Sequence, residues 1–135
     1  MKFLITLLIL LGLSINLNSV NAASGGSITG SSLYKSGKKL VIKAKKLEEK
    51  NKIAKAESLY LKALDKLEKA YDKDKKNADI LNYLGYSLRK TGNLEKAEAF
   101  YLKGLKLDAG HLGINEYLGE LYVQTGRIEL AKERL

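Results

Sequence analysis

Few side chains in this 135-residue chain have the types and spacing that catalysis or metal binding requires. There is one histidine, His111, and no cysteine, so nothing completes a zinc site around it. Acidic pairs such as Glu95 and Glu98 stand among lysines, on helix faces that we expect to be exposed, where no apolar pocket raises a carboxyl pKa. The sequence therefore predicts a protein that is not an enzyme and that holds no metal and no cofactor. We expect His111 to be a solvent-exposed turn residue.

One spacing recurs through the C-terminal half of the chain. The residues Leu84, Gly85, Gly92 and Ala97 reappear 34 positions later as Leu118, Gly119, Gly126 and Ala131. A fixed period of this length predicts stacked helix–turn–helix units, none of which buries its apolar face alone. For the unit 78–111 we expect a first helix over 78–90 with Asn77 as its N-cap, a turn at Gly92, and a second helix from Leu94. Gly85 is small where the two helices approach, and Tyr101 fills the space beside it.

A further unit aligns at an offset of 41 residues, where residues 51–64 match residues 92–105. Asn51 takes the place of the turn glycine, and asparagine tolerates the left-handed backbone better than most residues. The seven additional residues correspond to about two helical turns. We place them at the end of the second helix, through Leu67, Ala70 and Tyr71. Lys43 stands where the second unit has Leu84, so this unit matches least well.

These residues resemble the tetratricopeptide repeat (TPR) family over residues 37–135. The positions that match the family pattern are Leu84, Gly85, Gly92, Ala97 and Tyr101, and Leu81 replaces the usual tryptophan. The chain has no proline, so we expect Gly110 to end the second helix where the family has a proline. The resemblance implies an all-α fold, an α-solenoid of about three antiparallel helix–turn–helix repeats at about 37–77, 78–111 and 112–135. An ordinary helical bundle with coincidental matches is the alternative.

The N-terminus has the pattern of a secretory signal peptide. Lys2 precedes an 11-residue apolar run, Phe3 to Leu13, and small or polar residues follow up to Ala22. We predict a Sec-type signal peptide over 1–22, cleaved after Ala22, and a flexible linker over 23–36. An uncleaved anchor is the alternative, although the run is shorter than the roughly 20 residues that span a bilayer. The prediction is an exported bacterial protein of the periplasm.

Positive charge is concentrated in the first unit. The net charge is +9, residues 35–76 contribute +8, and residues 77–135 are neutral overall. One hypothesis is an electrostatic tether to an anionic envelope surface, lipid or polyanion, through the basic patch Lys38, Lys39, Lys45 and Lys46. The other interpretation is compositional, because 21 of the 24 basic residues are lysine. We expect no nucleic-acid partner for an exported chain without aromatic residues between its lysines.

The resemblance also implies where a partner would bind. In this family the first helices line a concave groove that holds a protein or peptide. Transferred position by position, the predicted contact residues are Lys38, Val41 and Lys45 in the first unit, Asp79, Asn82, Tyr83, Tyr86 and Arg89 in the second, and Glu116, Tyr117, Glu120 and Gln124 in the third. The alternative is that some of them pack between helices. The predicted function is a non-enzymatic protein–protein interaction scaffold of the cell envelope.

The end of the sequence carries a further expectation. Ile128, Ala131 and Leu135 follow at i, i+3 and i+7, which predicts an apolar stripe facing the preceding helix. No polar capping helix follows, which suggests a truncated chain or an apolar end that another chain covers. A helix this short is unstable without packing. We therefore expect residues 127–135 to fray, or to order only by pairing with a second copy.

Overall fold

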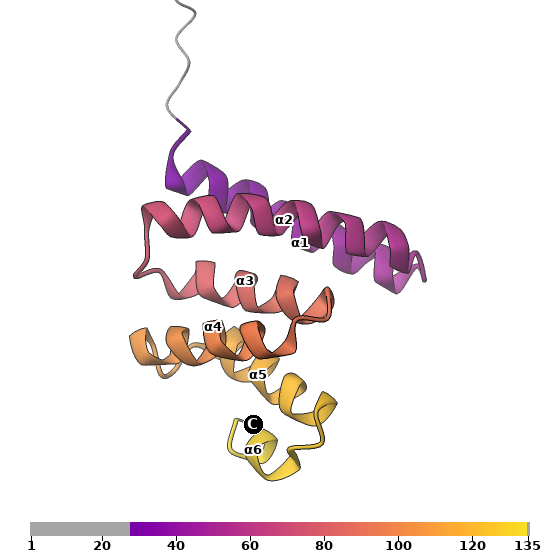
Figure 1. Ribbon diagram of the computed structural model, residues 1–135, viewed down its shortest axis with the longest axis vertical. Coiled ribbons are helices and arrows are strands. Elements are labelled where there is room, and N and C mark those ends of the chain that lie inside the picture. The colour runs from indigo at the N-terminus through magenta and orange to yellow at the C-terminus, as the bar shows by residue number, and fades with distance from the viewer. Residues whose placement is uncertain (1–27, 135) are drawn as a thin grey trace, which may run out of the picture.

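Six helices make up the part of the chain that the computed structural model describes, residues 28–134. They are α1 (Gly30–Glu49), α2 (Ile53–Lys73), α3 (Ala78–Lys90), α4 (Leu94–Leu107), α5 (Leu112–Gln124) and α6 (Ile128–Lys132). Figure 1 shows them stacked in chain order, with α1 and α2 at one end and α6 at the other. None of these helices is long and apolar enough to cross a membrane. The predicted signal peptide at 1–22 lies outside the described residues.

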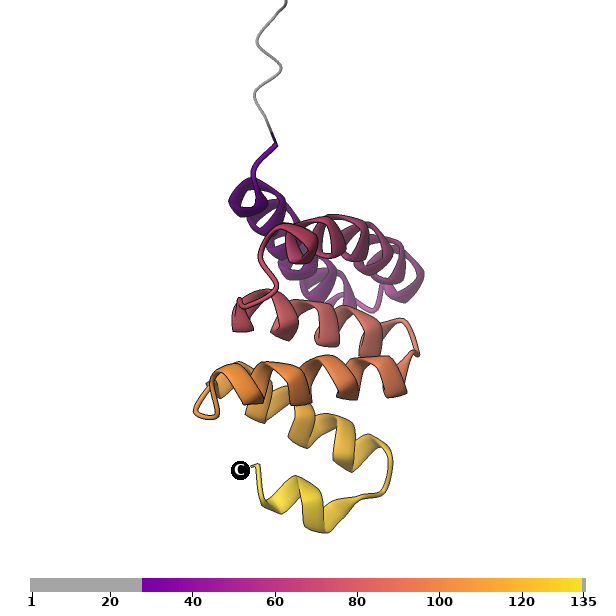
Figure 2. The same cartoon turned by 60° about the vertical axis from the view of Figure 1, so that its left-hand side comes forward.

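Consecutive helices pair as antiparallel hairpins, α1 with α2, α3 with α4, and α5 with α6. The hairpins follow one another because α3 packs against α2 and α5 packs against α4. The first helices also touch each other, α1 with α3 and α3 with α5. The turned view in Figure 2 shows the same single stack. This arrangement confirms the all-α solenoid that the repeat spacing predicted.

The turn inside each hairpin has the same geometry. Asn51, Gly92 and Gly126 have positive φ angles of 54°, 87° and 74°. In each turn the residue that follows donates its N–H to the carbonyl five positions earlier, at 2.8, 2.9 and 2.8 Å. Such bonds satisfy carbonyl groups that a helix end leaves free. The prediction that Asn51 replaces the turn glycine is therefore confirmed.

The first hairpin is longer than the others at both of its ends. The predicted linker over 23–36 is wrong from Gly30 onward, because α1 already begins there. Its first two turns pack on the additional turns of α2. Leu33 is buried, and a Cβ atom on Gly37 would lie 2.6 Å from Cγ of Leu67. The apolar end of α2 needed a partner, and residues 30–36 supply it as helix.

The turns between hairpins do not use glycine in the expected way. Among the described residues, only Gly92 and Gly126 have positive-φ glycine backbones, so the prediction that Gly110 ends α4 is wrong. Instead Asp108 accepts a hydrogen bond from the Gly110 N–H at 3.1 Å, and Asp74 accepts one from the Lys76 N–H at 3.2 Å. Both turns are thus closed by an aspartate side chain that bonds two residues ahead.

Three leucines of α3 form an apolar stripe against its neighbours. Leu81 and Leu84 are fully buried, and Leu88 is nearly so. Tyr101 is also fully buried, with its ring against Gly85, where a Cβ atom would lie 2.5 Å from Cε1 of the ring. The absence of a side chain at this position therefore sets the distance between α3 and α4.

The stripe expected at the end of the chain forms only in part. Ala131 is buried against α5, but Ile128 remains 46% exposed. Leu135 lies outside the described residues. The expectation of fraying over 127–135 stays a prediction, since α6 is present as a five-residue helix.

Candidate functional site

Tyrosines from three helices share one face of the stack. Tyr34 on α1 lies beside Tyr83 on α3, with ring centroids 6.1 Å apart. Tyr86 on α3 lies beside Tyr117 on α5, with centroids 4.5 Å apart. We call these four residues the tyrosine face. The side chains meet there because α1, α3 and α5 are adjacent in the stack.

Two lysines of α1 lie over these rings. The ammonium group of Lys38 is 5.9 Å from the ring centroid of Tyr34 and 5.6 Å from that of Tyr83. The ammonium group of Lys45 is 5.2 and 5.4 Å from the centroids of Tyr86 and Tyr117, and it donates a hydrogen bond to the Tyr117 hydroxyl at 3.2 Å. Cations at these distances are attracted by the ring faces.

The tyrosine face keeps these lysines charged. Burial alone would lower the pKa of Lys45, but the hydrogen bond to Tyr117 and the nearby Tyr86 hydroxyl outweigh it and raise that pKa. The pKa of Lys38 is also raised, first by Tyr83 and then by Tyr34. Neither lysine forms an ion pair with a carboxylate within residues 28–134. The face therefore presents two cations that make no direct ion pair within the described residues, although Asp79 lies near Lys38 and Glu116 near Lys45.

Tyr86 packs against Tyr60, whose hydroxyl belongs to a polar network. The Tyr86 ring is only 4% exposed and packs edge-on against Tyr60 at 5.8 Å. The Tyr60 hydroxyl donates to Glu48 at 2.9 Å, and the other Glu48 oxygen pairs with Lys90 at 2.9 Å. Burial is the main cause that raises the pKa of Tyr86. These links among α1, α2 and α3 fix the ring in place before any partner binds.

The predicted contact residues differ in how deeply they are buried. Asn82 and Tyr86 are buried, at 5% and 4% exposure, so they form part of the packing. A Cβ atom on Gly113 would lie 2.8 Å from Nδ2 of Asn82, which places this amide against the start of α5. The half-buried residues are Tyr83 and Tyr117, whereas Glu116 and Glu120 are exposed.

Two further predicted contact residues already make contacts within the chain itself. Arg89 is hydrogen-bonded to Glu120 across α3 and α5, and only 9% of its side chain is exposed. Val41, in the first unit, is 1% exposed and belongs to the core. The accessible part of the predicted surface is therefore Tyr83, Tyr117, Glu116 and the two lysines.

The predicted basic patch does not form one surface. Lys38 and Lys45 lie on the tyrosine face, half-buried, while Lys39 and Lys46 are exposed. Sequence reasoning missed Tyr34 because it lay in the expected linker. The apolar end of α2 was the feature that could have found it, since that end required a helical partner around residue 34.

His111 connects the first helices of two hairpins. Its Nδ1 atom accepts the N–H of Ile114 at 3.1 Å and so caps α5, and its Nε2 atom lies 3.1 Å from a carboxylate oxygen of Asp79 on α3. Only 14% of the side chain is exposed. The expectation of a solvent-exposed turn histidine is therefore wrong, because capping draws the ring onto the helix end.

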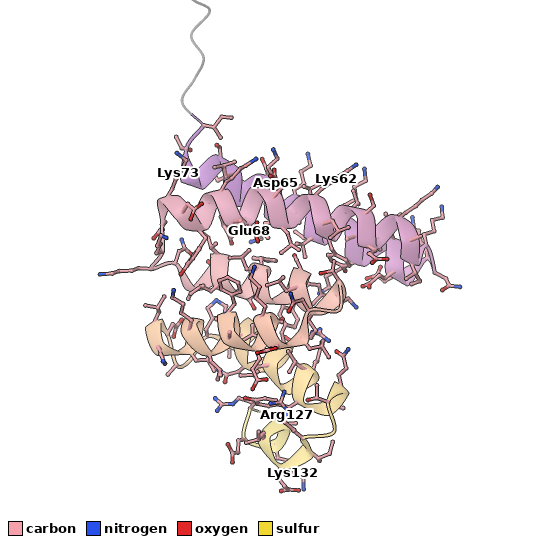
Figure 3. The ribbon with its side chains drawn as sticks, in the orientation of Figure 1. Lys62, Asp65, Glu68, Lys73, Arg127 and Lys132 are labelled. Carbon is pink, nitrogen blue, oxygen red and sulfur yellow. The ribbon has the colours of Figure 1, made fainter. Side chains whose placement is uncertain are left out.

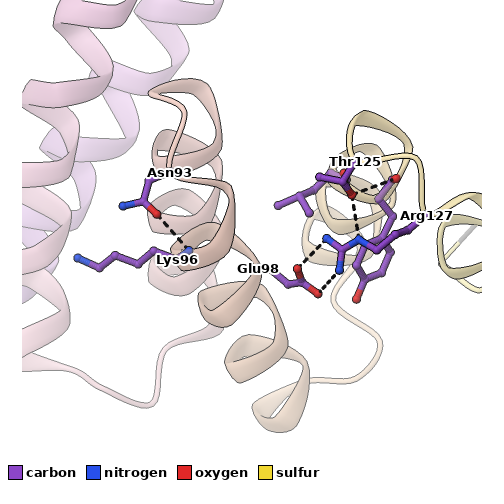
Figure 4. A network of polar contacts seen from close by, with 7 residues as sticks. Asn93, Lys96, Glu98, Thr125 and Arg127 are labelled. Atoms are coloured by element: carbon purple, nitrogen blue, oxygen red, sulfur yellow. Dashed lines mark hydrogen bonds and ion pairs between the residues drawn. The ribbon is translucent and has the colours of Figure 1, made fainter.

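A second contact joins the second and third hairpins, between α4 and the turn that connects α5 and α6. Figure 4 shows Arg127 facing Glu98 of α4, with two parallel hydrogen bonds of 2.9 and 2.7 Å. The same guanidinium donates to the Thr125 hydroxyl at 2.9 Å and lies 4.6 Å from the ring centroid of Tyr122. This planar pairing fixes the α5–α6 turn against α4.

The chemistry of these residues is suited to binding. No group of three or more histidine, cysteine, aspartate or glutamate side chains in residues 28–134 is placed to hold a metal ion. Two hollows of the surface lie elsewhere, between α1 and α2. The tyrosine face offers aromatic area and hydroxyl groups, which are typical of protein interfaces, and it adds two ammonium groups.

Comparison with known proteins identifies the repeat. Residues 78–111, which are α3, α4 and the turn after them, match the family model of the tetratricopeptide repeat. No curated protein matches the chain. A solved structure similar to it is the C-terminal TPR-containing domain of a Plasmodium falciparum protein described as FK506-binding. The two chains are 26% identical, the similarity covers 78% of this chain and 76% of that one, and the TM-score is 0.45.

The matched hairpin is the middle one of three. The same left-handed turn recurs at Asn51 and at Gly126, in the hairpins before and after it. Repeats of this kind are typically non-enzymatic scaffolds for protein–protein interaction. Residues 78–111 therefore match one tetratricopeptide repeat, and hairpins with the same left-handed turn lie on both sides of it.

Proposed function

We propose that this protein is an exported scaffold whose tyrosine face holds an acidic peptide segment of a partner protein. The observation that supports this proposal most strongly is the pair Lys38 and Lys45. Both ammonium groups lie over tyrosine rings and neither has a carboxylate partner in the described chain. A bound carboxylate would form the direct ion pair that both lysines lack, and the rings beside Lys45 partly shield that cation from water.

The spacing of the two lysines suggests the form of the peptide. They are seven residues apart on α1, which corresponds to about 10 Å along a helix. In a polyproline II segment, residues i and i+3 point the same way and lie about 9 Å apart. An extended partner with acidic residues at i and i+3 would therefore meet both lysines. The rings of Tyr83 and Tyr117 would contact the residues between them.

Photo-crosslinking tests the location of the site. A photoreactive phenylalanine analogue placed at Tyr83 or Tyr117 should capture a partner in intact cells, because these side chains are half-buried on the tyrosine face. The same analogue at Lys39, which is exposed elsewhere on α1, should capture little. Equal capture from all three positions would contradict the proposal.

The lysines of α1 provide a matched charge control. Lys38→Ala with Lys45→Ala should abolish most binding, whereas Lys39→Ala with Lys46→Ala removes the same charge at the same spacing and should leave binding intact. If both pairs weakened binding equally, and if added salt abolished it, the electrostatic tether would be the better explanation. The tether otherwise stays a prediction that no contact in the described residues favours.

The cellular location forms a separate part of the proposal. It rests on the apolar run Phe3–Leu13 and the small residues before Ala22. N-terminal sequencing of protein recovered from the periplasmic fraction should begin at Ala23. Protein found only in the cytoplasm, or with an intact N-terminus, would contradict export by cleavage and would leave the binding site untouched.

A further inference from the structure

The first hairpin has an apolar seam on the side that faces away from α3. Two adjoining hollows lie between α1 and α2 and share Ser58. We call this surface the outer seam and define it by six lining residues, Leu40, Leu47, Lys55, Ser58, Leu61 and Lys62. Leu61 is 55% exposed there, although it lies beside other apolar side chains. This surface is distinct from the tyrosine face.

The second hairpin shows how such a seam is filled. Its equivalent surface contacts α2, and there Leu81, Leu84 and Leu88 are 0%, 0% and 5% exposed. Their counterparts 41 positions earlier are Leu40, Lys43 and Leu47, none of which is buried. Leucine at two of these three positions retains the apolar character of a covered surface, while Lys43 adds a charge at its centre.

The polar contacts across the internal seam are specific. Lys96 of α4 lies 3.8 Å from a carboxylate oxygen of Glu68 on α2, and Lys103 donates a hydrogen bond to the hydroxyl of Tyr71 on α2. The Tyr71 ring also packs edge-on against Phe100. Two lysines of the second hairpin therefore meet an acid and an aromatic residue on the helix that covers them.

The outer seam has lysines at the positions equivalent to Lys96 and Lys103. Lys55 and Lys62 stand 41 positions before Lys96 and Lys103, and neither forms an ion pair within residues 28–134. Figure 3 shows Lys62 on the side of α2 away from α3, and Glu68 on the side that faces the second hairpin. The acid that also lines the outer seam, Asp65, is already paired with Lys66 and Lys69. Lys55 and Lys62 therefore lack the acid and the aromatic ring that meet their counterparts Lys96 and Lys103.

We propose that the outer seam binds an amphipathic helix of a partner protein. The sequence pattern of this partner helix is the one with which α2 covers the second hairpin. It has an apolar residue, an acidic residue four positions later, and an aromatic residue three positions after the acid. In α2 these residues are Leu64, Glu68 and Tyr71. The acid meets Lys55 and the aromatic residue meets Leu59 and Lys62. A further acid near Lys43 offsets the desolvation of that central charge.

A second copy of this chain is a poorer occupant. Its own helix with this pattern is α2, whose Glu68 and Tyr71 are already engaged with α4. The only other helix of comparable length in the described chain is α1, and its neighbouring Lys39, Lys43 and Lys46 would repel the lysines of the seam. Charge complementarity therefore favours an acidic helix from another protein.

A peptide copied from residues 60–74 serves as the probe. Its binding to the full chain is followed by fluorescence anisotropy. The pair Lys55→Glu with Lys62→Glu should weaken binding about tenfold or more, since the charge pair at Lys55 is replaced by repulsion and the contact of Lys62 with the aromatic residue is lost. The matched control, Lys39→Glu with Lys46→Glu, has the same charge change and the same seven-residue spacing, and should bind normally. A probe with Glu68→Lys should regain affinity for the Lys55→Glu variant.

Four outcomes would overturn the proposal. They are no binding to the unaltered chain, equal weakening by both variant pairs, and failure of the reversed charge to restore affinity. The fourth is self-association, seen by sedimentation and lost in the Lys55→Glu and Lys62→Glu pair, which would make the seam an interface between copies. Binding that appeared only after removal of residues 1–27 would instead identify that segment as the occupant. Photo-crosslinking from Tyr83 would be unaffected by any of these results, so the tyrosine face is tested separately.

Discussion

Replacing Gly85 with alanine tests the contact that sets the spacing of the second hairpin. An added Cβ atom would lie 2.5, 2.7 and 2.8 Å from three ring carbons of Tyr101. Non-bonded carbons pack best at about 3.5–4.0 Å, so the new methyl group overlaps the ring by about 1 Å. Tyr101 is fully buried and its ring atoms are not the free end of a flexible chain, so it has little room to move.

The magnitude follows from two opposing effects. Overpacking of this kind costs about 1–3 kcal/mol, and alanine in place of glycine inside a helix gains about 1 kcal/mol. Because the Tyr101 ring is fully buried and cannot move aside, we expect an overpacking cost of about 2–3 kcal/mol, so that Gly85→Ala lowers the free energy of unfolding by about 1–2 kcal/mol. For a domain of this size that corresponds to a fall of roughly 5–10 °C in Tm.

Urea and thermal unfolding, both followed by circular dichroism, measure this change. Combining Gly85→Ala with Tyr101→Leu should cost less than the sum of the two single changes, because the shorter side chain makes room for the methyl group. The first hairpin has Ala44 and Tyr60 at the equivalent positions, both buried. Unchanged stability in Gly85→Ala would show that α3 and α4 can adopt the spacing of α1 and α2, and would refute the assignment of Gly85 as the residue that fixes it.

Three further changes test single contacts. His111→Ala should lower stability by about 1 kcal/mol in urea unfolding through loss of the α5 cap, whereas His111→Asn keeps a capping acceptor and should lose only the contact with Asp79. Arg127→Lys should lower the urea midpoint, because an ammonium group cannot make both hydrogen bonds to Glu98, and an unchanged midpoint would mean that the pair does not hold the turn. Burial and then Glu48 raise the pKa of Tyr60 in the folded state, so stability is complete below the unfolded tyrosine pKa near 10 and falls as pH rises above it. Tyr60→Phe should make the urea midpoint less sensitive to pH between about 9 and 11.

The local pattern of the sequence determined the repeat and its turns. Glycine or asparagine at Asn51, Gly92 and Gly126 marks the left-handed residue of each turn, which few other residue types adopt at low cost. The period of 34 residues and the turn at Gly92 predicted the second hairpin, with α3 over 78–90 and the start of α4 at Leu94. These features are readable because they depend on backbone conformation and on helical periodicity, and both are local properties of the chain.

Other features depended on which surfaces meet in space. Helix formation over residues 30–36 was not predicted, because this stretch is rich in serine and glycine and becomes helical by packing on Leu67 and its neighbours. The role of His111 was missed for a similar reason, because its second partner, Asp79, is 32 positions away.

For the candidate sites, too, some features followed from the sequence and others only from the packing of the helices. The sequence by itself placed Tyr83, Tyr117 and the lysines on first helices, and it revealed the excess of lysine in the first unit. Only the tertiary structure decided that Lys38 and Lys45 lie over tyrosine rings, that Asn82 and Tyr86 are buried, and that Lys55 and Lys62 occupy an uncovered copy of an internal seam. A sequence pattern fixes the face of a helix on which a residue lies, whereas the packing of neighbouring helices decides whether that face is covered, shared or open to a partner.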